Sequence, residues 1–100
     1  MIDLNFDFTA PLWEWTGKGS WHFVTVPAEI SADIKAFTKH LAKGFRTVRV
    51  SVTIGETCWQ TSLFPSTDHG GYLLPVKAAV RITESLCAGQ DVHVELAVPT

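Results

Sequence analysis

The chain has 100 residues, the length of one domain, so we expect a single domain over residues 1–100. With 46% apolar and 18% charged residues, the composition excludes an intrinsically disordered chain. The formal net charge of −2, without any block of like charge, disfavours a strongly basic nucleic-acid module but leaves a local basic patch open.

The amino-terminal quarter is expected to be β structure. Residues 2–9 alternate strictly between apolar and polar side chains, which predicts a strand with one face in the core. Pro11 is expected to break this strand, leaving a bent edge piece over residues 12–15 and a turn over residues 16–20. A second strand is predicted over residues 21–26.

An amphipathic helix is predicted to start at Pro27 and to end at Gly44. Apolar residues recur in it at spacings of four, three and four, namely at Ile30, Ile34, Phe37 and Leu41. This spacing places the four side chains on one helix face, which we expect to lie on a sheet.

A β-hairpin is predicted next. Residues 46–54 alternate, and the apolar residues expected to face inward are Val48, Val50, Val52 and Ile54. Gly55 and Glu56 suit a two-residue turn with glycine first, and residues 57–63 form the returning strand.

The second half repeats the order of the first: strand, proline, amphipathic helix, glycine, strand. A loop over residues 65–71 precedes a short strand at 72–74. A helix then starts at Pro75 and ends at Gly89, and the last strand covers residues 91–98. The helix is marked by Val76, Ala79, Val80, Thr83 and Leu86. The strand ends at residues 24–27 and 73–75 are expected to correspond.

Five or six short strands and two helices in so small a chain predict a compact, mainly β fold, a small β-barrel whose closure removes exposed edges. The alternative is a two-layer α+β sandwich.

An ordered set of motifs resembles the bacterial domain-of-unknown-function family 1905. The motifs are WHFVTVP at residues 21–27, IG at 54–55, TSLFP at 61–65, GGYLLP at 70–75, and the pattern Leu74-Pro75-x-Lys77-x-x-x-Arg81. The resemblance covers nearly the whole chain. It implies a fold rather than an activity: a double-split β-barrel, an architecture shared with transcription regulators of the AbrB and MazE antitoxin type.

The comparison with AbrB-type regulators can be followed along the second half. Those regulators have a strand, a proline, a short helix with an early arginine, and Gly-Asp before a valine-rich strand. Pro75, Arg81, Gly89 and Asp91 follow that order. Arg81 lies farther after the proline than is usual, however, and Gln90 separates the glycine from the aspartate, which puts a shared DNA-reading surface in doubt.

Lys77 and Arg81 are four residues apart and so share one face of the second helix. If the strand that carries Thr61 and Ser62 packs beside this helix, the two hydroxyls and the two cations suit an anion such as a phosphate or carboxylate. The alternative is a solvated helix face on which Arg81 pairs with Glu84 or Glu95.

Four tryptophans are many for a chain of this length: Trp13, Trp15, Trp21 and Trp59. Trp13 and Trp15 are two apart and would face one side of a strand. Aromatic walls are typical of a pocket for a flat organic ligand, whereas the alternative is that they fill a small barrel. We place Trp59 and Tyr72 in the candidate site with the residues above. Stacking of single-stranded bases is disfavoured because few basic residues lie among these tryptophans.

The remaining reactive residues predict no catalytic, metal or cofactor site. Cys58 and Cys87 lack zinc-ligand spacing and are expected to be buried thiols. Ser62, Ser66, Asp68 and His69 crowd one turn-rich segment without a nucleophile elbow. His22 and His93 could meet across the sheet, but two ligands do not make a metal site, and both are expected to face solvent. Asp3 and Asp7 are too far apart along a strand to tune each other.

The leading hypothesis is a non-catalytic module that binds a small anionic or aromatic ligand. It would be cytoplasmic and form a homodimer, because no apolar run could span a membrane, Met1 opens no signal region, and double-split-barrel relatives commonly pair. The second hypothesis is an AbrB-like DNA-binding regulator with a basic stripe of Lys35, Lys39, Lys43, Arg46 and Arg49. An enzyme of unknown reaction is the third.

Overall fold

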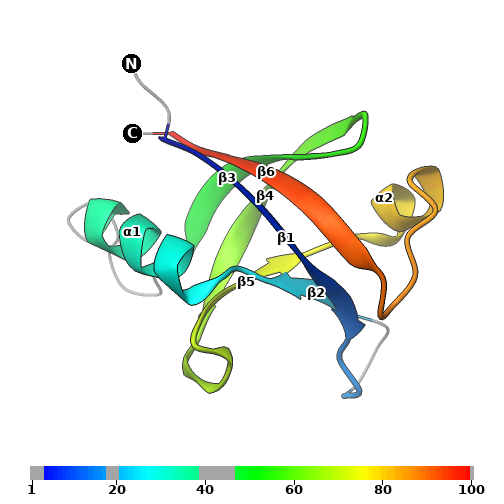
Figure 1. Ribbon diagram of the computed structural model, residues 1–100, viewed down its shortest axis with the longest axis horizontal. Coiled ribbons are helices and arrows are strands. Elements are labelled where there is room, and N and C mark those ends of the chain that lie inside the picture. The colour runs from blue at the N-terminus through cyan, green and yellow to red at the C-terminus, as the bar shows by residue number, and fades with distance from the viewer. Residues whose placement is uncertain (1–3, 18–20, 39–46, 100) are drawn as a thin grey trace.

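Six antiparallel strands form a closed barrel in the computed structural model (Figure 1), which describes residues 4–17, 21–38 and 47–99. The strand order around the barrel is β1-β2-β5-β4-β3-β6, and two helices lie at opposite sides of it. The elements are β1 (Leu4–Glu14), β2 (His22–Thr25), α1 (Ala28–Thr38), β3 (Val48–Ile54), β4 (Thr57–Ser66), the 3₁₀ turn η1 (Thr67–His69), β5 (Gly71–Pro75), α2 (Ala78–Thr83) and β6 (Asp91–Val98). The predicted mainly β barrel with two helices is therefore confirmed.

The barrel interior is filled by the apolar residues of alternating strands. In β3 and β6, every second side chain is buried, as the alternation predicts: Val48, Val50, Val52, Ile54, Val92, Val94, Leu96 and Val98. The turn between β3 and β4 is the predicted two-residue turn, because Ile54 pairs with Thr57 and Gly55 has φ +60°. Leu12, Val24, Leu63 and Leu74 complete the centre of the core.

Pro11 does not break the first strand, contrary to the prediction. β1 runs through it, pairing with β6 as far as Pro11 and with β2 from Leu12 onward. The Leu12 N–H donates to the Gln90 carbonyl on the β6 side. Because successive N–H groups of a strand point to opposite edges, the Pro11 nitrogen faces the other edge, where no partner strand has yet begun. A proline costs no hydrogen bond there.

The two halves of the chain are related by an approximate twofold axis. Exchanging β1-β2-α1-β3 with β4-β5-α2-β6 leaves every pair of neighbours in the barrel unchanged. Val26 N–H donates to the Tyr72 carbonyl and Val76 N–H donates to the His22 carbonyl, each at 2.9 Å. The two donors lie 50 positions apart in the chain, and so do the two acceptors. A residue of β2 or α1 therefore corresponds to the residue 50 positions later. The predicted correspondence of Pro27 with Pro75 is thus wrong by two residues: Pro27 corresponds to Lys77.

Helix α1 buries part of the face that its apolar spacing predicts, since Ile34 is buried and Ile30 packs against the core, but the buried face is turned away from Phe37. Ser31, Ile34 and Thr38 are the buried residues, whereas Phe37 is 47% exposed. The Ser31 hydroxyl donates to the Val26 carbonyl and accepts from the Tyr72 N–H. It thus bridges two backbone groups at the point where the pairing of β2 with β5 ends. This contact draws the helix close to the sheet and turns Phe37 outward. The predicted end at Gly44, like Leu41, lies outside the described residues.

Helix α2 ends at Thr83, not at Gly89 as predicted. Ser85 adopts φ +55°, and the Leu86 N–H donates to the Arg81 carbonyl at 2.8 Å, which is the pattern that closes a helix by a left-handed residue. Gly89, with φ +93°, instead belongs to the turn before β6. The helix therefore has six residues, and its apolar contact with the barrel is made mainly by Val80.

Candidate functional site

A groove of about 610 Å³, here called the α2 groove, opens between β4 and the segment that joins β5 to α2. Its walls include Trp21, Trp59, Thr61, Phe64, Lys77 and Arg81. The opening follows from the strand pairing. β4 pairs with β5 only over residues 64–66, and its earlier part, residues 57–63, pairs with β3 alone. The edge of β4 that faces away from β3 is left uncovered there, and α2 begins beside it.

Four of the six residues predicted for the site lie in this groove. Arg81 lines it from α2 and Lys77 from the N-cap position just before that helix, so the two predicted cations lie in one groove. Trp59 and Thr61 line it from β4, where they pair with the buried residues Val52 and Val50. Strand and helix thus bring two cations, a hydroxyl and an indole together from segments about 16–22 residues apart in the chain.

The other two predicted residues do not line the α2 groove. Ser62 pairs with Arg49, and because neighbouring side chains of a strand alternate, it points to the face opposite that of Thr61. Tyr72 is 7% exposed and belongs to the core. It lines a second groove of about 450 Å³ beside α1, here called the α1 groove. The predicted pairing of the Thr61 and Ser62 hydroxyls in one site is therefore wrong.

Arg81 is oriented by the backbone rather than by a carboxylate. Its Nε–H donates to the Val76 carbonyl at 3.2 Å, and its side chain is partly buried. The ion pairs with Glu84 or Glu95, considered as an alternative, are not formed: the Glu84 carboxylate accepts from the Thr57 hydroxyl at 2.6 Å, and no acidic oxygen of the described residues lies within 4.0 Å of the guanidinium. The terminal nitrogens of Arg81 therefore have no carboxylate partner in the part of the chain that the structure describes.

The approximate twofold axis shows what distinguishes the two grooves. Arg81 corresponds to Ser31, and both side chains donate to the equivalent carbonyl at 3.2 Å, of Val76 and Val26 respectively. Trp21 corresponds to Gly71 in the same way. The α1 half thus has two small residues, Ser31 and Gly71, where the α2 half has a cationic and an aromatic residue, Arg81 and Trp21.

His22 and Phe64 line the α2 groove although they were not predicted as site residues, and Trp21, one of the four tryptophans considered for an aromatic pocket wall, lines it as well. Trp21 and His22 come from the start of β2, which lies beside the end of β5 because the two strands are antiparallel. The sequence signal for the approach of β2 to the groove is the internal repeat. A twofold axis brings the start of β2 beside the end of β5, its counterpart in the other half.

A comparison with protein-family models matches residues 8–96 to a domain of unknown function, DUF1905. The chain belongs to this family. No curated protein matches the chain. The resemblance to DUF1905 expected from the motifs is confirmed, but the family description assigns no activity, so a function has to be argued from the site itself. Neither helix in the described ranges is long and apolar enough to cross a membrane.

The DUF1905 chain carries a column of aromatic rings on the outside of β1 and β2. Trp21 is stacked on Phe23 with centroids 6.2 Å apart, Phe23 is tilted against Trp13 at 5.2 Å, and Trp13 is stacked on His69 at 4.8 Å. Trp13 also donates to the Thr25 hydroxyl at 2.9 Å. Trp13 and Trp15 do not line the α2 groove, and the pocket wall predicted from them is not formed.

The segment around His69 does not form a hydrolytic site. Ser66 and His69 share a hydrogen bond of 2.9 Å across one exposed 3₁₀ turn. Because the His69 ring is stacked on Trp13 and no described carboxylate lies within 4.0 Å of it, the third group that orients a catalytic base is missing here.

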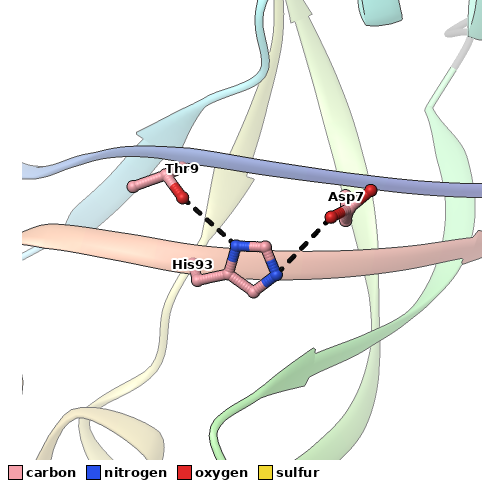
Figure 2. Close-up of polar contacts among 3 residues, drawn as sticks. All are labelled: Asp7, Thr9 and His93. Carbon is pink, nitrogen blue, oxygen red and sulfur yellow. Dashed lines mark hydrogen bonds and ion pairs between the residues drawn. The ribbon is translucent and has the colours of Figure 1, made fainter.

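His93 lies on β6, where its side chain contacts Thr9 and Asp7 of β1 (Figure 2). Its Nδ1 shares a hydrogen bond of 3.1 Å with the Thr9 hydroxyl, and its Nε2 lies 3.7 Å from an Asp7 carboxylate oxygen. The predicted meeting of His22 and His93 is wrong, since His22 pairs with Glu14 and His93 pairs with Thr9. Asp7 also lines a hollow of about 300 Å³ between β1, β3 and β6, but His93 and Thr9 do not line it. Within the described part of the chain, no group of three or more histidine, cysteine or acidic residues could hold a metal ion.

The two cysteines are exposed free thiols, not buried residues as predicted. Cys58 lies on the outer side of β4, where its sulfur and the Thr53 hydroxyl are 3.3 Å apart. Of the basic stripe considered for DNA binding, Lys35 and Arg49 are exposed, and the other three residues lie outside the described ranges.

Proposed function

We propose that this protein is a non-catalytic module that binds a small organic anion in the α2 groove. One observation carries the proposal: the groove presents Arg81 and Lys77 beside apolar walls, and no carboxylate of the described residues lines it or pairs with Arg81. An arginine held in place without an internal counter-charge suits an external carboxylate or phosphate.

The groove has the size and composition of a small-molecule site. A volume of about 610 Å³ lies within the roughly 300–1,000 Å³ range of ligand pockets, which combine apolar walls with a few polar groups. Trp59, Phe64 and Val76 supply the apolar walls, and Thr61 adds a hydroxyl. Apolar walls lower the local dielectric constant and so strengthen the attraction between an anion and the two cations.

The polar groups of the groove support binding rather than catalysis. Thr61 is the hydroxyl of the lining, and no hydrogen bond between described residues joins it to a base. A hydroxyl nucleophile requires a base within hydrogen-bond distance and a group that orients this base. The α2 groove therefore offers orientation and charge, which are the requirements of a binding site.

The proposal is tested by calorimetric titration with naphthalene carboxylate and with the neutral naphthalene methanol. We expect the carboxylate to bind more tightly than the alcohol. The Arg81→Met variant should lose about tenfold or more of the affinity for the acid, because a charge-assisted hydrogen bond is lost. Arg49→Met is the matched control, since Arg49 lies on the outer face of β3, and it should leave the affinity unchanged.

Equal affinities for the acid and the alcohol, or equal losses in the Arg81 and Arg49 variants, would contradict the proposal. Melting temperatures of both variants exclude unfolding as the cause of a loss. A DNA duplex titrated into the same proteins examines the AbrB-like alternative, for which affinity must fall steeply with salt and with the Arg49→Met change.

A further inference from the structure

The α2 groove differs from the α1 groove at two equivalent positions. In the α1 half, these positions hold Ser31 and Gly71, and a methyl group added to Gly71 would overlap the Ser31 hydroxyl. Ser31 is accordingly 4% exposed. In the α2 half, the positions hold Arg81 and Trp21, and Trp21 is 53% exposed. The side chains of Arg81 and Trp21 are too large for the close contact that Ser31 and Gly71 make. They therefore line the groove instead of being buried under the helix.

Trp21 is exposed and yet held in place. One face of its indole is stacked on Phe23 with an interplanar angle of 9°, and Phe23 in turn is packed on Trp13. The Trp21 carbonyl accepts a hydrogen bond of 2.8 Å from the Trp15 N–H. A side chain that is already ordered loses little conformational entropy when a ligand binds against it. The part of the indole that Phe23 leaves uncovered therefore forms a ready surface of the groove.

Arg81 is ordered by a different contact at the same groove. Its bond to the Val76 carbonyl uses Nε, so the two terminal nitrogens are the part left for an anion. The groove therefore combines a fixed flat apolar surface with a fixed fork of hydrogen-bond donors. A ligand complementary to both must carry a flat ring and an acidic group.

We propose that the ligand of the α2 groove is a planar aromatic acid, whose ring stacks on Trp21 while its anionic group binds Arg81. This inference rests on the proposed function and specifies its ligand class. Lys77, the N-cap residue of α2, adds a second positive charge to the groove lining. An aliphatic acid would satisfy Arg81 but would lose the stacking with the indole.

The test compares naphthalene carboxylate with decalin carboxylate, its fully saturated counterpart, by calorimetric titration of the full chain. We expect the aromatic acid to bind about tenfold more tightly, from the stacking contribution. Trp21→Ala should remove most of this preference, because both acids lose apolar contact with the indole but only the aromatic acid also loses the stacking. Trp15→Ala is the matched control, because Trp15 is similarly exposed but does not line the groove, and it should retain the preference.

Two results would overturn the inference and leave the proposed function intact: equal binding of the two acids to the unaltered protein, or an undiminished preference in Trp21→Ala. The comparison of the two acids does not depend on a variant, so it decides the question even if Trp21→Ala fails to fold. Failure of both acids to bind at millimolar concentration would instead contradict the proposed function. The two failures are therefore distinguishable.

Discussion

Replacement of Ser31 by alanine should destabilise the barrel more than an ordinary serine substitution. The Ser31 hydroxyl lies between the Tyr72 N–H, at 3.1 Å, and the Val26 carbonyl, at 3.2 Å, and it takes the place of a direct rung between β2 and β5. Its removal leaves one donor and one acceptor without a partner in a buried position. At about 1–3 kcal/mol for each unsatisfied group, with partial relaxation, we expect a loss of about 2–4 kcal/mol.

Such a loss is a large share of the roughly 5–15 kcal/mol by which domains are stable. Urea unfolding followed by circular dichroism measures it as a lower midpoint at an unchanged slope, and the melting temperature should fall by about 10–20 °C. Ser51→Ala, at an exposed position of β3, is the control and should change stability by less than about 0.5 kcal/mol. A similar small change in Ser31→Ala would refute the argument, because it would mean that the strands close the rung directly once the hydroxyl is removed.

Three further outcomes follow from the packing of the helices and the exposure of the thiols. Gly71→Ala should destabilise the protein by about 1–3 kcal/mol in the same unfolding assay, since the added methyl group has no space beneath α1. Ile34→Ala should cost about 2–5 kcal/mol, whereas Phe37→Ala should cost less than about 1 kcal/mol because Phe37 faces solvent; equal losses would show that the face assigned to α1 is wrong. Cys58 and Cys87 should both react with a thiol reagent in the native protein, and protection of either until unfolding would contradict its exposure.

Regular alternation was sufficient to predict the strands that form the centre of the barrel. β6 was predicted over residues 91–98 and has these bounds, and all four inward residues of β3 were predicted. In both strands, one side faces a uniformly apolar interior and the other faces solvent, so the period of two is undisturbed. The hairpin turn at Gly55 could be predicted because a two-residue turn depends on local backbone conformation.

Features that depend on distant contacts could not be predicted from the local pattern. Pro11 is tolerated in β1 because the neighbouring strand begins one residue later, which is a property of the assembled barrel. Ser31 rather than Phe37 faces the sheet because its hydroxyl satisfies two backbone groups of other strands. Hydrophobicity alone favours the phenylalanine at a buried position, so the apolar spacing was right at Ile34 and wrong at Phe37.

The candidate site was predictable in part, for similar reasons. Lys77 and Arg81 follow from helical spacing within one element. Strand alternation separates Ser62 from Thr61 but does not by itself exclude it, because Phe64, on the same face of β4 as Ser62, lines the groove. Trp21 was considered for an aromatic wall, but its place beside Arg81 could not be predicted, because the antiparallel pairing of β2 with β5 brings it there from about 60 positions away in the chain.

We propose above that the α2 groove holds an organic anion against Arg81. The most direct measurement is chemical-shift mapping of backbone amides during titration of the isotope-labelled protein with naphthalene carboxylate. We expect the largest shifts at residues that line the α2 groove, including Thr61 and Lys77, and their loss in Arg81→Met. Shifts centred on the α1 groove, or shifts that persist in Arg81→Met, would contradict the claim.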